Sequence, residues 1–482
     1  MNKQECAIKY VEDNYLQFNR LRHDIIADKL QVRCAHPIGD RLRAPHDTSV
    51  AGDPAEAKGE RQEQWREMTK HDINSIVCHA AQEYDANITS REVMTALQSD
   101  LIPDVHPLRE YILSLPPFTP DQPDWIDFVA SQVRVRTNNN EDTLIQQPKQ
   151  QITNNIPLAN TASGEGNNPI PSASEPSEHL NISSADRLWR GCFKKWFVAM
   201  VASWMKDEVV NHQVLVLIGK QGIFKTTWLE HLIPPHLRAY ACKLANSNDL
   251  NKDERLRIAE FGLISLDEID SMNNRELNQL KSVITATDVN ERAAYAYTKE
   301  RRVRLASFCA SGNRRDFLTD ITGNRRWLPF EVESIQNPFT TILPYERMYA
   351  QAWALAQDPL FSYWFDLEEI EVMEQHNQYF RDESNEEQLL PILFDVPAEG
   401  RGEFMTTAQI SERLVTYGNI KKPMALSRLG MVLGAAGFRA VTRNAGSGRA
   451  RGWIVYQRDN NEIDTLRRLL KDETSQLDTA IY

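Results

Sequence analysis

Residues 215–227 hold the side chains whose types and spacing most clearly predict chemistry in this chain. An apolar run, Leu-Val-Leu-Ile, leads into Gly-Lys-Gln-Gly-Ile-Phe-Lys-Thr-Thr. In turns of this composition the backbone N–H groups surround a β-phosphate, the lysine reaches the β- and γ-phosphates, and a Ser or Thr hydroxyl ligates Mg²⁺. The segment therefore predicts a nucleotide site that takes ATP and Mg²⁺. The expected nucleotide-binding residues are Gly219, Gln221, Gly222, Ile223, Phe224, Lys225, Thr226 and Thr227, and Thr226 is also an expected metal ligand at the start of the following helix.

Phe224 departs from this pattern, because the position before the lysine is ordinarily a glycine. Its side chain limits how closely the backbone approaches a phosphate, so these residues taken alone are a moderately specific signal. A site that binds ATP but hydrolyses it slowly is compatible with this substitution.

Two further segments end in polar residues of the kinds that ATP hydrolysis needs. Residues 262–266 form a short apolar run that is followed by Asp267 and Glu268. Asp267 is expected to hold Mg²⁺ through water, and Glu268 to polarise the water that attacks the γ-phosphate. Residues 304–311 form another such run and lead to Asn313, which suits a residue that orients the same water. Taken singly, the acid pair is also typical of a helix start and the asparagine of a turn.

The elements that must position these residues are the strands and helices of an α/β fold. Apolar runs at 214–218, 262–266 and 304–311 each end at one of the chemical segments, which predicts neighbouring strands whose ends converge on one triphosphate. Residues 185–205 have apolar and aromatic residues at helical spacing, and we expect a helix that lies on the sheet. Core packing is favoured for its aromatic residues over a base-stacking surface. Residues 338–380 predict helices that close the same domain.

Residues 186 to about 355 resemble the virulence-associated E (VirE/VapE) family, which are P-loop ATPases related to superfamily 3 helicases. The resemblance rests on the phosphate loop at 219–227, Leu-Asp-Glu at 266–268, Ser-Phe-Cys-Ala-Ser-Gly-Asn at 307–313 and Thr-Gly-Asn-Arg-Arg-Trp-Leu-Pro at 322–329. It implies an α/β P-loop NTPase core of the AAA+ or superfamily 3 helicase type. It further implies that Arg325 or Arg326 completes the ATP site of a neighbouring subunit, since a guanidinium binds γ-phosphate oxygens bidentately. The alternative is a structural ion pair with Asp316 or Asp320.

Residues 291–304 predict a β-hairpin, because apolar and polar residues alternate on either side of a Thr-Lys-Glu tip. Superfamily 3 relatives place a DNA-contacting hairpin just before the strand that carries the asparagine. A solvated surface hairpin is the alternative. By the resemblance, the phosphate contacts would be Lys299, Arg301 and Arg302, and the base-stacking residue would be Tyr295 or Tyr297.

Residues 400–460 predict a second nucleic-acid-binding unit. Thr406 or Thr407 is an expected helix N-cap, a second helix pattern covers 425–435, and two strand-like runs flank a glycine-rich basic turn, which is the order of a winged helix. Between 400 and 458 there are ten Lys or Arg and two acids, which favours a phosphate-facing surface. Protein docking is the alternative use of this unit. The expected phosphate contacts are Arg428, Arg439, Arg443, Arg449 and Arg451, flanked by Lys421 and Lys422.

The composition limits the remaining possibilities. The 482 residues include 67 Asp or Glu and 55 Lys or Arg, a formal charge of −12, so contacts with nucleic acid must be local. Six cysteines without Cys-x-x-Cys spacing argue against a zinc ribbon or a disulfide scaffold and favour a reducing compartment. The sequence has no apolar signal core and no apolar run of about 18 residues, which predicts a soluble, cytoplasmic protein without a membrane partner.

The expected domain order has five parts. Residues 1–134 resemble a primase-associated helical module, with helix-like patterns at 5–31, 70–84, 90–100 and 107–115. Residues 135–184 are rich in Asn, Gln, Ser, Pro and Thr and predict a disordered linker. The remaining parts are the ATPase core at 185–380, the winged-helix-like basic domain at 400–460 and a helix or tail at 461–482.

Together these features predict an ATP-hydrolysing DNA helicase or translocase of superfamily 3 type, acting in replication or mobilisation of a phage-like or mobile-element-like unit. The expected partners are single-stranded or forked DNA and further copies of the chain in a hexameric ring, because the arginine must arrive from another subunit. A primase encoded separately is also expected, since residues 1–134 hold no primase-like acid cluster. Two alternatives are a nucleotide-gated DNA-binding switch with slow ATPase, anchored by the winged helix, and a defence-type signalling ATPase.

Overall fold

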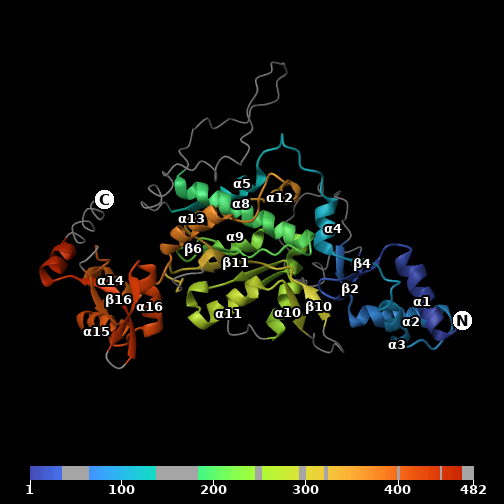
Figure 1. The fold of residues 1–482 in the computed structure, drawn as a ribbon. Helices are drawn as coiled ribbons and strands as arrows, with labels where there is room; N and C mark the ends of the chain where they lie inside the picture. Colours follow the sequence, from blue (N-terminus) through green and yellow to red (C-terminus); the bar gives the residue numbers. More distant parts are fainter. Residues whose placement is uncertain are drawn as a thin grey trace, which may run out of the picture.

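The structure, a computed structural model, describes residues 1–34, 64–136, 183–244, 252–291, 300–319, 324–398, 402–445 and 448–468. Figure 1 shows a central α/β body with a smaller N-terminal unit at one end and a C-terminal unit at the other. Within the described ranges, no helix is long and apolar enough to span a membrane.

A six-stranded sheet forms the middle of the central body, in the order β5-β12-β6-β11-β8-β7. Neighbouring strands are parallel except for β5, which pairs antiparallel with β12. The strands are β5 (Val133–Val135), β6 (Val214–Ile218), β7 (Ala241–Leu244), β8 (Leu263–Leu266), β11 (Ser307–Gly312) and β12 (Trp327–Ile335). The three predicted strands are therefore confirmed, although the third begins at Ser307 and not at Arg304.

Helices cover both faces of the sheet. Strand β6 is accordingly apolar at every position, because its side chains are buried on both sides. Successive side chains of a strand point to opposite faces, so Leu215 and Leu217 join one core while Val214, Val216 and Ile218 join the other. One face carries α8 (Ser184–Met205), α9 (Lys225–His231), α12 (Tyr345–Gln357) and α13 (Leu367–Gln378), and the other carries α10 (Lys252–Glu260) and α11 (Asn274–Thr285) (Figure 1).

Helix α8 has the core role that its sequence predicts. The side chains of Trp189, Trp196 and Trp204 are fully buried. Each indole N–H donates to a backbone carbonyl of the body at 3.0 to 3.1 Å, so the polar atom of each ring is satisfied. These aromatic residues therefore hold α8 on the sheet and are closed to a nucleic-acid base.

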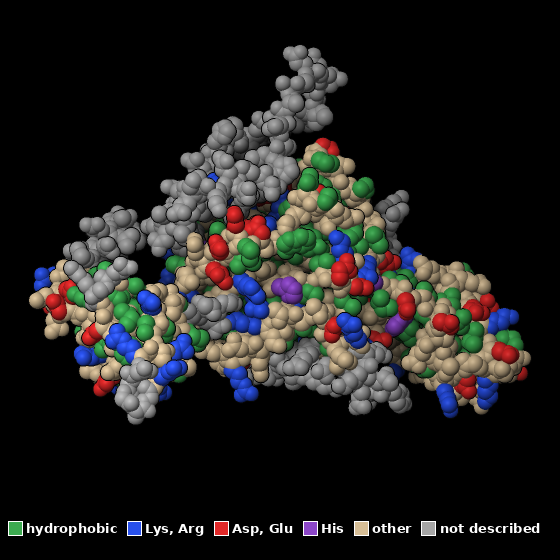
Figure 2. All heavy atoms as spheres, viewed as in Figure 1, with side chains coloured by type: hydrophobic (Ala, Val, Ile, Leu, Met, Phe, Trp, Pro, Cys, Tyr) green, Lys and Arg blue, Asp and Glu red, His purple; other side chains and the backbone are tan. Residues whose placement is uncertain are grey.

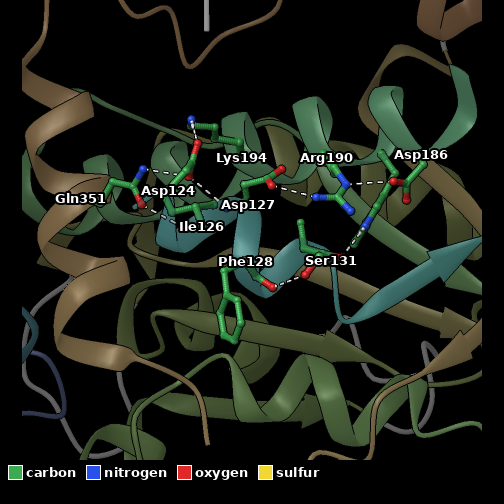
Figure 3. A network of polar contacts seen from close by, with 11 residues as sticks. Asp124, Ile126, Asp127, Phe128, Ser131, Asp186, Arg190, Lys194 and Gln351 are labelled. Atoms are coloured by element: carbon green, nitrogen blue, oxygen red, sulfur yellow. Dashed lines mark hydrogen bonds and ion pairs between the residues drawn. The ribbon is translucent and has the colours of Figure 1, made fainter. Parts of the chain in front are cut away.

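The central body begins earlier in the chain than predicted. Helices α4 (Pro107–Ser114) and α5 (Trp125–Ala130) and strand β5 belong to its core. Asp124 at the start of α5 accepts hydrogen bonds from Lys194 (2.5 Å) and Gln351 (2.8 Å), and Asp127 pairs with Arg190 at 2.7 Å (Figure 3). The predicted boundary at residue 134 is therefore wrong, and residues 107–135 belong with the central body. Residues 137–182 of the predicted linker lie outside the described residues.

The N-terminal unit combines helices with a sheet. The helix predicted for residues 5–31 is confirmed over Lys3–Val11 and the π-helix Glu12–Leu16, but Leu21–Asp24 and Lys29–Cys34 are strands, which corrects the second half of that prediction. Strand β1 carries polar residues at two buried positions, and this hides the alternation that would identify a strand. Arg22 pairs with Glu110 at 2.5 Å, and Asp24 accepts a hydrogen bond from the Tyr240 hydroxyl at 2.5 Å. The predicted helices at 70–84, 90–100 and 107–115 are confirmed. The elements are α1 (Lys3–Val11), α2 (Lys70–Glu83), α3 (Ser90–Leu97), β1 (Leu21–Asp24), β2 (Lys29–Cys34), β3 (Gln64–Glu67) and β4 (Asp104–Val105), with the sheet order β3-β2-β1-β4.

The C-terminal unit has the predicted order of helix, helix and hairpin. Its elements are β14 (Glu403–Met405), α15 (Thr407–Gly418), α16 (Leu426–Ala435), β15 (Arg439–Ala445) and β16 (Gly448–Gln457). Thr406 caps α15, as predicted, and Gln409 completes the capping box. Strand β16 pairs antiparallel with both β14 and β15. Helix α14 (Asn385–Leu393) contributes Leu390 and Leu393 to the same core, so this unit begins before residue 400.

Candidate functional site

The three chemical segments meet at one edge of the sheet. Strand β11 lies between β6 and β8, and all three run parallel. Their carboxyl ends therefore lie side by side, which brings the turn after Ile218, the acids after Leu266 and the asparagine after Gly312 together. In open parallel sheets, this edge is where ligands bind.

Lys225 lies at the centre of this edge. Its ammonium donates to the carbonyl oxygens of Gly219 (2.8 Å) and Lys220 (2.7 Å) and to Oδ1 of Asn313 (3.2 Å). Burial lowers the pKa of Lys225, while the negative charges of Asp270 and Asp267 oppose the shift. Within the described residues the ammonium makes no ion pair, so neutral oxygens hold a positive charge in the turn that phosphates would enter.

Asp267 lies beside the lysine in a network of hydroxyl groups. Its Oδ1 accepts hydrogen bonds from Thr226 Oγ1 (3.1 Å) and Ser311 Oγ (2.7 Å). Its Oδ2 lies 2.8 Å from the Lys243 ammonium. Burial alone would raise the pKa of Asp267, but the hydrogen bonds from Lys243, Ser311 and Thr226 hold it below its ordinary value. The carboxylate is therefore ionised at neutral pH.

This donor set, made only of oxygen atoms, fits Mg²⁺. It offers a carboxylate and hydroxyl oxygens, and Mg²⁺ prefers one or two such ligands completed by water and phosphate oxygens. In the described part of the chain, no group of three or more His, Cys, Asp or Glu gathers as a soft-metal site would require. The predicted ligands Thr226 and Asp267 are thus adjacent.

The turn from 219 to 224 needs unusual backbone geometry. A Cβ atom at Gly219 would lie 2.6 Å from the carbonyl oxygen of Val332, so only glycine allows β12 to approach. Gly222 has a φ of +85° and Phe224 a φ of +68°. Phe224 thus adopts the left-handed conformation that a glycine would take without strain. The other expected contacts, Gln221, Ile223 and Thr227, belong to this turn or to the first turn of α9.

Glu268 and Asp270 have different surroundings. Glu268 also has a left-handed backbone, with φ of +53°, and its exposed carboxylate has no hydrogen-bond partner among the described residues. Asp270 accepts hydrogen bonds from the backbone N–H groups of Asn313 (3.1 Å) and Arg314 (3.0 Å). Glu268 is therefore open to solvent at the site, whereas Asp270 fixes the loop that presents Asn313.

The sequence did not point to three residues that shape this site. They are Lys243, Ser311 and Asp270. Ser311 and Asp270 lie within the two segments that carry Asn313 and Asp267. Their polar side chains, close to these predicted site residues in the sequence, could have identified them as part of the site. Lys243 is the next-to-last residue of β7, an outer strand of the sheet, and no local pattern connects it with Asp267.

Arg325 and Arg326 lie at the opposite edge of the sheet. They precede β12, and Trp327, the first residue of β12, pairs with Val214, the first residue of β6. A strand of five residues spans about 16 Å, so neither arginine is near the Lys225 of its own chain. In the described ranges neither makes an ion pair. Burial and the charge of Arg325 lower the pKa of Arg326.

The alternative role for these arginines was a structural ion pair with Asp316 or Asp320. Asp316 pairs with Arg315 instead, at 3.1 Å. Asp320 lies outside the described residues. Two adjacent guanidinium groups without acidic partners in the described structure form a surface that suits an anion supplied by another molecule.

The predicted central hairpin is present as β9 (Asp288–Glu291) and β10 (Glu300–Val303), which pair antiparallel. Tyr295, Tyr297 and Lys299 lie outside the described residues. Arg301 is exposed and pairs with Asp288 at 2.8 Å. Arg302 is directed at Asp28 of the N-terminal unit (3.3 Å) and at Glu260 (3.8 Å). Both arginines thus pair with acids of the chain, and their role as phosphate contacts stays a prediction.

The basic residues of the C-terminal unit divide into two groups. Arg428 donates to the carbonyl oxygen of Thr319 at 3.1 Å, so it ties this unit to the central body. Arg443, Arg449 and Arg451 are exposed on the hairpin β15–β16. In the strand register, Arg443 lies opposite Ala450 and Thr442 opposite Arg451. Arg443 and Arg451 therefore point to opposite faces of the hairpin, and Figure 2 shows basic side chains over this unit.

Comparisons with known proteins identify the central body. Residues 174–387 match the family model of the virulence-associated protein E-like domain. This mixed α/β part of the chain, with its parallel strands, thus matches the virulence-associated protein E-like domain, as the sequence resemblance predicted. No curated protein matches the sequence.

Three solved structures of the NrS-1 C-terminal region are similar at low identity. An apo structure of this region is 11% identical with a TM-score of 0.41, covering 93% of this chain and 99% of that one. Two A-form apo structures have identities of 10% and 12% and TM-scores of 0.41 and 0.39. They cover 93% and 91% of this chain and 99% and 98% of theirs.

Proposed function

We propose that this chain is an ATP-hydrolysing DNA helicase or translocase, with a P-loop core of the superfamily 3 type within the AAA+ ATPases. Its role would be replication or mobilisation of a phage-like or mobile-element-like unit. The convergence of Lys225, Asp267 and Asn313 at the carboxyl edge of the sheet carries this proposal. The strand order supports it, because β11 places Asn313 between the phosphate loop and the acids.

The chain's own groups have distinct tasks in this mechanism. The backbone N–H groups of the turn at 219–226 bind the β-phosphate, and Lys225 exchanges its carbonyl partners for phosphate oxygens. Thr226 and Asp267 would hold Mg²⁺, which would supply positive charge beside the phosphates. Glu268 accepts the proton of a water whose oxygen bonds to the γ-phosphorus, while the bond to the bridging oxygen breaks and ADP leaves. Asn313 orients that water.

Catalysis in this proposal needs a second copy of the chain. Arg325 and Arg326 lie too far from their own Lys225, and neither pairs with an acid in the part of the chain that the structure describes, which suits the γ-phosphate bound by a neighbour. We infer a ring, with six subunits as the expected number.

DNA contacts are assigned to the C-terminal unit. Its order of β14, α15, α16 and the hairpin β15–β16 supports a winged helix, and exposed arginines lie on both faces of the hairpin. Single-stranded or forked DNA is the proposed partner, with a separately encoded primase and a cytoplasmic location.

ATP hydrolysis by variants of the acid pair and the lysine tests the proposal. Lys225→Ala should abolish nucleotide binding, and Glu268→Gln should retain binding but lose turnover by about 100-fold or more. Glu371→Gln, an exposed glutamate of α13, is the control and should behave as wild type. Unchanged turnover in both site variants would refute the assignment.

The second candidate is a nucleotide-gated DNA-binding switch with slow hydrolysis. The left-handed conformation of Phe224 favours it, since a side chain there restricts the phosphate loop. Unwinding of a forked duplex separates the two. Hydrolysis that never accompanies strand separation, with or without a primase, selects the switch.

A further inference from the structure

The phosphate loop has an aromatic cluster directly beside it. The ring of Phe339 lies 6.3 Å from that of Phe224 and 5.5 Å from that of His231, with interplanar angles of 81° and 86°. Phe224 precedes Lys225, and His231 ends α9. The cluster therefore joins the loop that would hold the phosphates to the helix that follows it.

Phe339 is 72% exposed. Most of its ring is open to solvent, while its edge contacts with Phe224 and His231 fix its position. The exposed ring is thus presented to solvent directly beside the loop that would hold the phosphates.

The loop that carries Phe339 is held rigidly. Asn337 Oδ1 accepts a hydrogen bond from the Phe339 N–H at 3.0 Å, and the Asn337 carbonyl accepts one from Thr340 N–H at 3.1 Å. Beyond the loop, the Tyr345 hydroxyl donates to the carbonyl oxygen of His231 at 2.7 Å. The turn at Asn337 and the anchor at Tyr345 thus keep Phe339 next to α9.

Strand β12 explains why this loop reaches the phosphate site. Glu331 pairs with Ile218, the last residue of β6, so residues 332–335 extend past the end of β6. Val332 lies against Gly219, where no Cβ would fit. The segment after Ile335 therefore emerges beside the phosphate loop and not at a distant surface.

We propose that the ring of Phe339, held by its edge contact with Phe224, is the platform on which the base of a nucleoside triphosphate stacks. The proposal rests on the proposed function, because the phosphate loop fixes one end of the ligand. The flat base of a nucleotide is the chemical partner of an exposed phenyl ring, and stacking of this kind tolerates any base. The platform thus contributes affinity for nucleosides in general, and the phosphate loop contributes affinity for the triphosphate.

Two ligands that share phosphates but differ in the base test this proposal. Binding of adenylyl imidodiphosphate and of inorganic tripolyphosphate, each with Mg²⁺, is measured by calorimetry on the full-length chain. Phe339→Ala should weaken adenylyl imidodiphosphate by about tenfold and leave tripolyphosphate within about twofold of wild type. Phe339→Trp should restore the affinity. Ile342→Ala, a change at an 89% exposed residue of the same loop, is the control and should bind both ligands as wild type does.

The other results have distinct meanings. Equal weakening of both ligands in Phe339→Ala, or no weakening of either, overturns the platform. A loss of oligomer size in Phe339→Ala with unchanged nucleotide affinity assigns the ring to a contact between subunits and also overturns it. If wild type binds neither ligand, the proposed function itself fails and the platform fails with it.

Discussion

The ammonium of Lys243 lies 2.8 Å from Oδ2 of Asp267, the carboxylate proposed to hold Mg²⁺. The hydrogen bond to Asp267 raises the pKa of Lys243, so the lysine is charged at neutral pH. A cation of the chain thus occupies one oxygen of the carboxylate, while Ser311 and Thr226 occupy the other.

Replacing Lys243 should change the requirement for Mg²⁺. In Lys243→Met the competing ammonium is gone, and we expect the Mg²⁺ concentration for half-maximal nucleotide binding to fall by up to about fivefold, since the lysine is half exposed and its pair is weak. A Mg²⁺ titration of nucleotide binding measures this. Lys70→Met, at an exposed position of α2, should leave the titration unchanged. A higher Mg²⁺ requirement would show instead that Lys243 helps to bind the phosphates.

Adding one methyl group at Gly219 should damage the site. Its Cβ would lie 2.6 Å from the Val332 carbonyl oxygen, so Gly219→Ala must push β12 away, at a cost of about 1–3 kcal/mol and with loss of nucleotide affinity. Gly191→Ala is the matched control, because no atom lies within 4 Å of its added Cβ in α8. Helix propensity predicts that this control is neutral or stabilising by up to about 1 kcal/mol. Thermal unfolding and nucleotide binding report both effects, and a Gly219→Ala protein equal to wild type contradicts the close approach.

Mixing inactive variants should restore hydrolysis if the arginines act on a neighbour. The double variant Arg325→Ala with Arg326→Ala keeps an intact phosphate loop, and Lys225→Ala keeps intact arginines. A mixed oligomer of the two contains complete sites and should regain part of the ATPase rate. Lys225→Ala mixed with Glu268→Gln is the control, because both changes lie at the same edge and no complete site forms. Failure of the first mixture to exceed the second would exclude an arginine supplied in trans.

The exposed hairpin arginines should control DNA affinity, and Arg428 should not. Arg443→Ala, Arg449→Ala or Arg451→Ala should each weaken binding of single-stranded DNA. Each should also lower the slope of log affinity against log salt by about 0.7 for each phosphate contact that is lost. Arg428→Ala should leave this slope unchanged, since its guanidinium contacts Thr319. Salt titrations of DNA binding decide between this result and a unit that docks protein, for which no hairpin variant alters the slope.

The stability of the N-terminal unit should depend on pH through Asp72. Two hydrogen bonds of 2.6 Å from the Arg66 guanidinium, assisted by Thr69, hold the pKa of Asp72 well below its ordinary value. A depressed folded-state pKa stabilises the fold fully above the ordinary carboxyl pKa of about 4 and loses that contribution as the pH falls further. Asp72→Asn should therefore destabilise α2 by about 1–3 kcal/mol at pH 7 and less at pH 3.

Amide exchange of α2 in the full-length chain measures the effect of Asp72→Asn. Asp85→Asn, an exposed position whose φ of +43° asparagine also tolerates, is the control and should show little change at either pH. A constant difference between Asp72→Asn and wild type over this range would place the origin of the stabilisation elsewhere.

Local patterns were sufficient to predict most of the site. The apolar runs before Gly219, Asp267 and Asn313 are buried strands, and burial on both faces of a parallel sheet produces such continuous runs. The glycines are needed by the phosphate loop itself, and the acid pair directly follows the apolar run of β8. For this reason the sequence could place Lys225, Asp267 and Asn313 at one edge.

Features that depend on distant pairing were not predictable. Residues 21–34 form a hairpin in which Arg22 and Asp24 are buried. Their side chains bond to Glu110 and Tyr240, which are distant in the sequence, and their polarity concealed the strand pattern. Strand β5 joins the sheet only through β12. Lys243 meets Asp267 only because β7 and β8 are neighbours. Each of these contacts depends on the order of strands in a sheet, and a short stretch of sequence does not determine that order.

The separation of Lys225 from Arg325 by the length of strand β6 has a consequence for assembly. If copies of the chain assembled in an open row, the subunit at one end would have a nucleotide site without a neighbour's arginine. The subunit at the other end would have arginines that contact no nucleotide. In a closed ring, every nucleotide site would receive an arginine from the neighbouring subunit. The proposed arrangement therefore favours a closed ring, and the ATPase rate per subunit would rise sharply at the number of subunits that closes it.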